Sequence, residues 1–200
     1  MKQRMVHLFA ALLSMLALTF ASSAYAGAAT DLVKGKQTTL FDLLKQGTPE
    51  AQKKIDAVFD EMLDYGALAE ASLGPEWAPR SDAEKAEFTD LLKKLVRNAY
   101  TKNLKKITGF DVDYLGEDAG DGGAMVVKTK SKPKDPRDEP VEINFKVVQK
   151  DGKWKVQDII TEGVSLVQSY RSQFTKIIKK DGWSALLQKM KDKLAKGDTG

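Results

Sequence analysis

Residues 139–175 read EPVEINFKVVQKDGKWKVQDIITEGVSLVQSYRSQFT and hold two alternating strands, a two-residue turn and the start of a helix in one run. Asp151-Gly152 separates the two alternating segments, and this pair favours a type I′ turn because Gly tolerates the positive φ that such turns require. If the turn places Lys150 opposite Lys153, the side-chain period of two fixes the register of the whole hairpin. We therefore expect a β-hairpin with one apolar face.

The predicted register pairs Val147 with Val156, Phe145 with Asp158, Ile143 with Ile160 and Val141 with Glu162. After Gly163 the apolar period changes from two to that of a helix, which we expect to begin near Val164 and to fold back over the apolar face. The predicted apolar face of the hairpin consists of Val141, Ile143, Phe145, Val147, Trp154, Val156 and Ile160. The apolar stripe of the following helix consists of Val164, Val167, Tyr170, Phe174, Ile177 and Ile178.

Two charged residues do not fit a plain core in this unit. Asp158 falls among apolar neighbours in the predicted register, and Arg171 lies one position from the helix stripe. A buried carboxylate needs a partner or a raised pKa. We expect a structural Asp158 that accepts hydrogen bonds near the Gly163 turn or from Arg171, and the alternative is a general base in a pocket.

The N-terminal 26 residues have the pattern of a secretory signal peptide. Lys2 and Arg4 form a basic region, residues 8–20 an apolar segment too short to span a bilayer, and Ala24-Tyr25-Ala26 a small-x-small cleavage site. We expect an exported protein whose mature chain, residues 27–200, is a single domain.

Composition excludes several classes of chemistry. Removal of Lys2 and Arg4 with the leader lowers the basic count from 32 to 30 against 28 acidic residues, a net charge of +2, so nucleic acid is not an expected partner. The only His, His7, leaves with the leader, and the chain has no Cys. The mature chain therefore offers no imidazole or thiol for zinc, a catalytic triad or a disulfide, and we expect neither an enzyme nor a metal site.

Helical patterns fill the first half of the mature chain. A helix is predicted from Asp31 to Lys45, and Thr48-Pro49 opens the next. Ser81-Asp82-Ala83-Glu84 is a capping box that starts the longest helix, which runs to about Lys106. The stripe of the second helix is Ile55, Val58, Phe59, Met62 and Leu63, and that of the longest includes Leu92, Val96 and Tyr100. These stripes are typical either of core or of a wall around a lipid.

From about residue 107 the apolar period becomes two. Four predicted strands follow one another with connections too short for a crossover, which predicts an antiparallel meander. The fold class is therefore α+β, a four-stranded antiparallel meander with helices that cover one face.

Two segments resemble a known family. WKVQDIITEGVSLVQSYRSQF, residues 154–174, and DYGALAEASLGPEW, residues 64–77, followed by a capped helix with Phe88 and Tyr100, are similar to the marked regions of the MlaC-like, toluene-tolerance family of periplasmic phospholipid carriers. That resemblance covers nearly the whole chain. It implies an apolar cavity for phospholipid, with no other cofactor, in a periplasmic auxiliary component of a lipid ABC transporter.

The same resemblance implies partners and a site. Lipid would pass between an outer-membrane lipoprotein complex and an inner-membrane transporter complex, which maintains the lipid asymmetry of the outer membrane, and we expect the carrier to be a monomer. The residues expected to contact lipid are Phe59, Met62, Leu63, Leu92, Val96, Val141, Ile143, Phe145, Val147, Val156, Ile160, Val164 and Val167.

Three alternatives stay open on the sequence. The first is an enzyme that uses Asp158 as a base in an apolar pocket beside Tyr100 or Tyr170. The second is a carrier of a hopanoid or another apolar molecule. The third is an interaction module whose basic helix, residues 82–106, docks on an acidic partner.

Overall fold

A five-stranded antiparallel sheet forms the centre of the computed structural model, which describes residues 27–106, 109–135 and 137–197. The strand order follows the chain, so the predicted meander is confirmed, and the one addition is a two-residue fifth strand. The predicted signal peptide lies outside the described residues. The strands are β1 (Asp111–Ala119), β2 (Met125–Lys132), β3 (Val141–Lys150), β4 (Lys153–Thr161) and β5 (Val164–Ser165).

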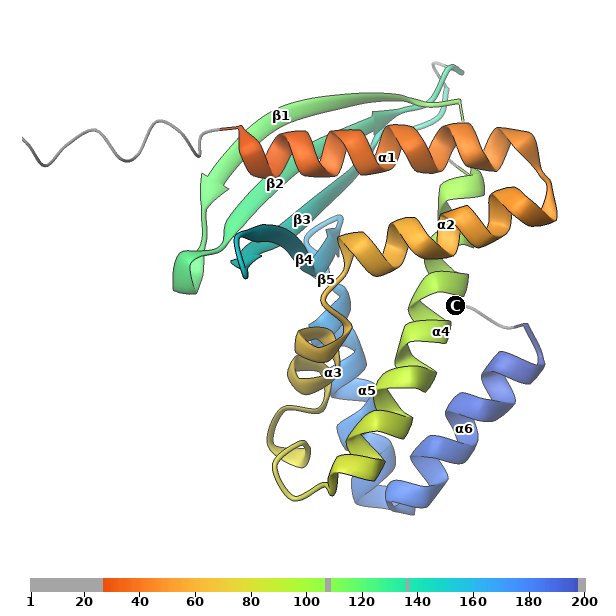
Figure 1. Cartoon of the computed structure of the whole chain (residues 1–200), viewed down its shortest axis with the longest axis vertical. Coiled ribbons are helices and arrows are strands. Elements are labelled where there is room, and N and C mark those ends of the chain that lie inside the picture. Colours follow the sequence, from red (N-terminus) through yellow and green to blue (C-terminus); the bar gives the residue numbers. More distant parts are fainter. Residues whose placement is uncertain (1–26, 107–108, 136, 198–200) are drawn as a thin grey trace, which may run out of the picture.

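Helices cover one face of this curved sheet (Figure 1). α1 packs on β1 and β2, whereas α2, α3 and α5 pack on β4, and α6 lies on α4 and α5 away from the sheet. The α+β class predicted from the sequence is therefore confirmed. The helices are α1 (Ala28–Gln46), α2 (Pro49–Met62), α3 (Tyr65–Leu73), α4 (Asp82–Lys106), α5 (Leu166–Asp181) and α6 (Trp183–Ala195), with short 3₁₀ turns at Gly74–Glu76 and Asp121–Gly123.

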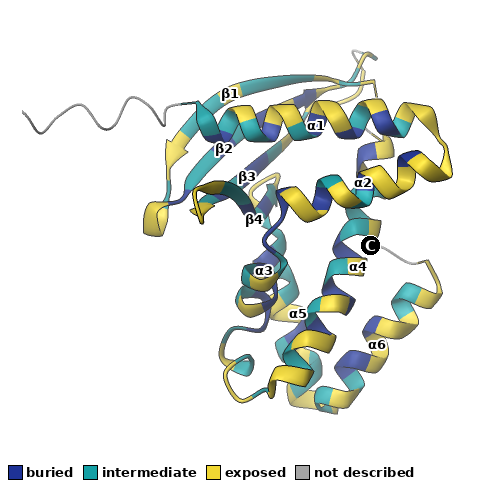
Figure 2. Ribbon diagram, in the orientation of Figure 1, coloured by how far each residue is buried: buried dark blue, intermediate teal, exposed yellow. Residues whose placement is uncertain are grey.

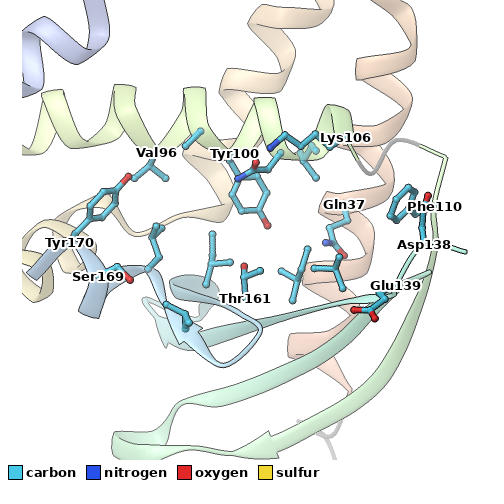
Figure 3. Close-up of a pocket in the computed structure, with 18 residues that line it drawn as sticks. Gln37, Val96, Tyr100, Lys106, Phe110, Asp138, Glu139, Thr161, Ser169 and Tyr170 are labelled. Atoms are coloured by element: carbon cyan, nitrogen blue, oxygen red, sulfur yellow. The ribbon is translucent and has the colours of Figure 1, made fainter. Parts of the chain in front are cut away.

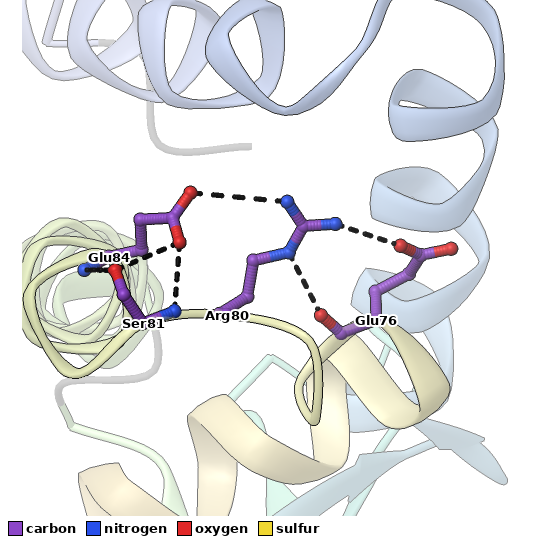
Figure 4. Close-up of polar contacts among 4 residues, drawn as sticks. All are labelled: Glu76, Arg80, Ser81 and Glu84. Atoms are coloured by element: carbon purple, nitrogen blue, oxygen red, sulfur yellow. Dashed lines mark hydrogen bonds and ion pairs between the residues drawn. The ribbon is translucent and has the colours of Figure 1, made fainter.

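The start of α4 is fixed by polar contacts. The backbone N–H of Ser81 donates to Glu84 Oε2 at 2.8 Å, and the N–H of Glu84 donates to Ser81 Oγ at 3.3 Å, which is the reciprocal pattern of a capping box. Arg80 holds the carboxylate of Glu76 at 3.2 Å and reaches Glu84 at 4.0 Å (Figure 4), and its guanidinium stacks on the ring of Trp183. This cluster anchors α4, whose other end reaches the sheet.

The hairpin turn between β3 and β4 has the predicted type. Asp151 has φ of 50° and Gly152 of 73°, the two positive values that a type I′ turn requires. Lys150 pairs with Lys153 and Val147 with Val156, as predicted. Beyond that point the predicted register is wrong.

A β-bulge at Gln157 shifts the rest of the hairpin by one residue. Phe145 pairs with Ile159 and not with Asp158, and Ile143 pairs with Thr161 and not with Ile160. Glu162 lies in the turn after β4 and is not part of a pair with Val141. Since neighbouring strand residues point to opposite faces, Ile160, which pairs with Asn144, lies on the face opposite Phe145.

The bulge lies where the chain leaving α2 meets the free edge of β4. Leu63 forms a parallel bridge with Val156, and the N–H of Asp64 donates to the carbonyl of Val156 at 3.0 Å. This additional backbone partner holds β4 in place beside the inserted residue, and a bulge of this kind re-aims the side chains that follow it.

Asp158 is structural, but its setting differs from the predicted one. Opposite Lys146, outside the apolar face, its carboxylate accepts hydrogen bonds from the N–H groups of Ile159 at 2.8 Å and Val167 at 3.1 Å and from the Ser165 hydroxyl. The expected contact with Arg171 is not formed, because the Arg171 Nε donates to the carbonyl of Ala71 at 2.8 Å. Asp158 thus joins β4 to the start of α5.

The core lies between the inner face of the sheet and the helices (Figure 2). Along β2 the buried residues Val127, Thr129 and Ser131 alternate with more exposed lysines, which shows that only one face of this strand is covered. Phe59, Phe88 and Phe145 are the largest of the fully buried side chains and link helices and sheet into one apolar cluster.

Candidate functional site: an apolar cavity between sheet and helices

A cavity of about 560 Å³ separates the sheet from α4 and α5 (Figure 3). Its volume falls within the roughly 300 to 1,000 Å³ typical of ligand sites. On one side lie Val141 and Ile143 from β3, Ile159 and Thr161 from β4, and Val164 from β5. On the other lie Val96, Ala99, Tyr100 and Leu104 from α4 and Leu166, Ser169 and Tyr170 from α5, with Gln37 from α1.

The bulge at Gln157 contributes directly to the wall. Without the inserted residue, alternation would place Ile160 beside Ile143, whereas the bulge turns Ile159 inward. Ile159 is buried and borders the cavity. Apart from Thr161, the part of β3 and β4 that lines the cavity is therefore aliphatic.

The opening is marked by the lining residues that are also exposed. The rim is polar: Asn103 and Lys106 come from the end of α4, and Asp138 and Glu139 precede β3, so that three of the four side chains are charged. Val164 is 61% exposed although it is a large aliphatic residue, and it also lines the cavity. An apolar interior that opens at a polar rim is the arrangement that an amphipathic ligand requires.

The interior holds few polar groups, and two of them are phenols. Burial raises the pKa of Tyr100 far above its ordinary value, and the neighbouring Tyr114 phenol adds to this effect. Burial also raises the pKa of Tyr170. Both side chains therefore remain neutral at physiological pH and add no charge to the cavity wall.

The predicted site residues divide into two groups. Val96, Val141, Ile143 and Val164 line the cavity. None of the other predicted residues borders the cavity. Ile160 is half-buried on the other sheet face, and the rest are buried. Contact of any of them with lipid stays a prediction. The residues placed in the packed core are Phe59, Met62, Leu63, Leu92, Phe145, Val147, Val156 and Val167.

Several lining residues were not predicted. Ile159 was missed because no local sequence pattern predicts the bulge that turns it toward the cavity. Gln37 carried a signal that could have been used, since it continues the buried face of α1 from Val33 to Leu40 at helical spacing but is polar. A polar residue within an apolar stripe indicates a site that needs hydrogen bonds.

The catalytic alternative does not match this geometry. Asp158 is not among the lining residues, and its carboxylate is engaged by three donors. Within the described residues, no group of His, Cys, Asp or Glu side chains could hold a metal ion. In the same part of the chain, no helix is long and apolar enough to cross a bilayer.

Comparisons with known proteins identify a family and a similar solved structure. The family model described as MlaC protein matches residues 34–192. Among solved structures, the fold is similar to that of a phospholipid-binding protein from Ralstonia solanacearum, solved in complex with a phospholipid, with a TM-score of 0.72 and 23% sequence identity. The match covers 84% of this chain and 98% of that one. No curated protein matches the chain in sequence.

Proposed function

This chain belongs to the MlaC protein family, and from that premise we propose that it is a periplasmic phospholipid carrier rather than an enzyme. The observation that carries the proposal is the apolar cavity with a polar rim between α4 and the sheet. Its structural relative from Ralstonia solanacearum was solved with a phospholipid, which supports the same class of ligand here.

The energetics of lipid transfer explain why such a cavity is needed. Two acyl chains with about 30 methylenes, at roughly 0.8 kcal/mol each, cost on the order of 20 kcal/mol to expose to water. A carrier must offset most of this cost between membranes. Aliphatic walls from β3, β4, α4 and α5 provide the apolar surroundings, and the rim leaves a headgroup in contact with water.

The proposed carrier exchanges lipid with two membrane partners. These are an outer-membrane lipoprotein complex and an inner-membrane lipid ABC transporter complex, and the carrier is a monomer between them. The assignment of these partners rests on family membership.

Organic extraction of the purified protein followed by mass spectrometry tests the ligand class. We expect phospholipid in the extract. A hopanoid or another apolar molecule would identify a different cargo, and an extract without lipid, together with no transfer between vesicles, would contradict the proposal.

A cavity-filling variant connects the ligand to the described site. Ile143→Trp places a larger side chain into the cavity, so it should fold, purify with much less phospholipid and transfer little lipid between donor and acceptor vesicles. Lys130→Trp adds the same side chain to an exposed position on the outer face of β2 and is the matched control. Full lipid occupancy in Ile143→Trp would show that the ligand lies elsewhere.

A further inference from the structure

The side-chain amide of Gln37 lies at the cavity, and its one described hydrogen bond is made by the oxygen. Gln37 is only 1% exposed, and its Oε1 accepts the hydroxyl hydrogen of Tyr114 at 2.9 Å. The Nε2 group has no acceptor among residues 27–106, 109–135 and 137–197. Because Gln37 lines the cavity, its Nε2 group has hydrogens available for water or for an occupant of that space.

Tyr100 presents a second donor to the same space. Its ring packs edge-on against Phe59 with the centroids 5.3 Å apart, which holds the phenol in one orientation. Its hydroxyl likewise has no acceptor in the described part of the chain, and its raised pKa keeps the hydrogen in place. Figure 3 shows the Tyr100 hydroxyl and the Gln37 amide both directed into the cavity, from α4 and α1 respectively.

Other polar groups on the wall differ from this pair. The Ser169 hydroxyl donates to the carbonyl of Ser165 at 2.8 Å and is therefore satisfied. Tyr170 stacks on Phe174 at a centroid distance of 5.1 Å and lies at the other end of the cavity (Figure 3). Thr161 also lines the cavity, from the exposed end of β4. Gln37 and Tyr100 are set apart by Tyr114, which bonds Gln37 and lies close enough to Tyr100 to affect its pKa, so that these two donors belong to one region of the wall.

The nature of the occupant follows from what these donors need. Water can satisfy them in an unloaded cavity, but a pure hydrocarbon chain displaces that water and offers no acceptor. An occupant with a carbonyl oxygen satisfies both, because a carbonyl oxygen has two lone pairs. The ester groups that join acyl chains to glycerol contain such an oxygen, whereas the ether oxygen of an alkyl lipid is a much weaker acceptor.

We propose that Gln37 and Tyr100 bind an acyl carbonyl oxygen of the lipid, so that the cavity selects ester-linked over ether-linked chains. This inference rests on the proposed function, since it assumes a glycerolipid in the cavity. It assigns to Gln37 and Tyr100 the role of positioning the ester region, and to Tyr114 that of orienting the Gln37 amide.

The test compares two phosphatidylcholines of equal chain length, one with two ester linkages and one with two ether linkages. Binding of each to the delipidated full mature chain is measured by displacement of a fluorescent phospholipid. We expect the parent to bind the diester about tenfold more tightly, which corresponds to about 1.4 kcal/mol. Tyr100→Phe and Gln37→Leu should each lower diester affinity severalfold and leave diether affinity unchanged.

Two further variants keep the result interpretable. Tyr65→Phe also removes a phenol oxygen, but one that binds Arg97 outside the cavity, so the preference for ester should persist. If Gln37→Leu alone fails to fold because Tyr114 loses its acceptor, the double variant Gln37→Leu/Tyr114→Phe removes both partners of that hydrogen bond.

The outcomes separate the inference from the proposed function. Equal affinity of the parent for diester and diether lipid would overturn the inference and leave the carrier function standing. Equal loss of both lipids in Tyr100→Phe would show a role in cavity shape alone and would also overturn it. Failure of the parent to bind either lipid would contradict the proposed function itself.

Discussion

Asp158 connects strand β4 to helix α5 through three hydrogen bonds. Its carboxylate accepts hydrogen bonds from the N–H of Ile159, the N–H of Val167 and the Ser165 hydroxyl. The oxygen of that hydroxyl caps α5, because it accepts a hydrogen bond from the Gln168 N–H at 3.0 Å. An ionised carboxylate is the strongest acceptor available for such a junction. The position of α5, and with it one wall of the cavity, therefore depends on this charge.

Asp158→Asn should destabilise the fold, because it weakens the junction between β4 and α5. Hydrogen bonds to charged groups contribute about 1.5 to 3 kcal/mol, and we expect the lower end because Asp158 is half-buried. Thermal unfolding should shift downward by roughly 3 to 6 °C for a domain of this size. Asp121→Asn, at an exposed position in the loop between β1 and β2, is the control. An unchanged unfolding temperature would refute the structural role.

The lowered pKa of Asp64 makes the stability of the fold depend on pH. Burial alone would raise the pKa of this carboxyl group, but the Ala67 N–H and the Lys150 ammonium, at 3.1 and 3.0 Å, outweigh that effect, so its pKa lies below the ordinary value. A lowered folded-state pKa stabilises the fold above the unfolded-state value of about 3.9, and this contribution disappears as the pH falls through the folded-state pKa.

Unfolding experiments on Asp64→Asn test this sign. The parent should be more stable than the variant at neutral pH, and the difference should shrink as the pH falls below about 4. The measurement is the midpoint of urea unfolding across this range, with the exposed Glu50→Gln as control. A difference that stays constant down to the lowest pH would mean that the Asp64 charge does not contribute.

At the level of elements, the sequence predicts what local pattern determines. The helices around Phe59 and Val96, the capping box at Ser81 and the Asp151-Gly152 turn all follow from spacing and caps. The bulge at Gln157 does not, because it depends on a tertiary contact from Leu63 and Asp64. A one-residue insertion exchanged Ile159 for Ile160 on the cavity wall.

The sequence also does not predict which residues of an apolar face pack in the core and which border the cavity. Val147 and Ile143 belong to the same face of β3, yet Val147 is fully buried against the core and Ile143 borders the cavity. Alternation identifies the face but not how closely the helices approach it. That distance is set by where α4 and α5 leave the sheet.

Val147→Trp should therefore behave differently from Ile143→Trp. Enlarging a side chain in a packed core costs about 1 to 3 kcal/mol, so Val147→Trp should lower the free energy of unfolding of the delipidated protein by this amount. Ile143→Trp should leave that free energy nearly unchanged, because the cavity accommodates the ring. Denaturant unfolding of both delipidated variants makes the comparison, and equal stability would contradict the placement of Val147 in the core.

For the molecule as a whole, the distribution of arginines limits how a lipid headgroup can be held. Arg97 binds Asp60, Arg80 binds Glu76, Arg171 binds the carbonyl of Ala71, and Arg137 binds Asp135 at 2.5 Å. Each arginine of the described chain thus already contacts an acceptor within the protein, and none borders the cavity. A bidentate clamp on phosphate, the geometry that guanidinium groups provide, is absent from the described rim.

We therefore expect broad headgroup tolerance. The described rim offers one lysine, Lys106, and two carboxylates, Asp138 and Glu139, all exposed to water, where ion pairs contribute about 1 kcal/mol or less. Lipids with equal chains and different headgroups should compete within about one order of magnitude, and Lys106→Ala should change their ranking only slightly. A preference above about a hundredfold, or roughly 2.7 kcal/mol, would require a headgroup contact that this rim does not provide. Competition within one order of magnitude would leave selection to the interior of the cavity, which Gln37 and Tyr100 line.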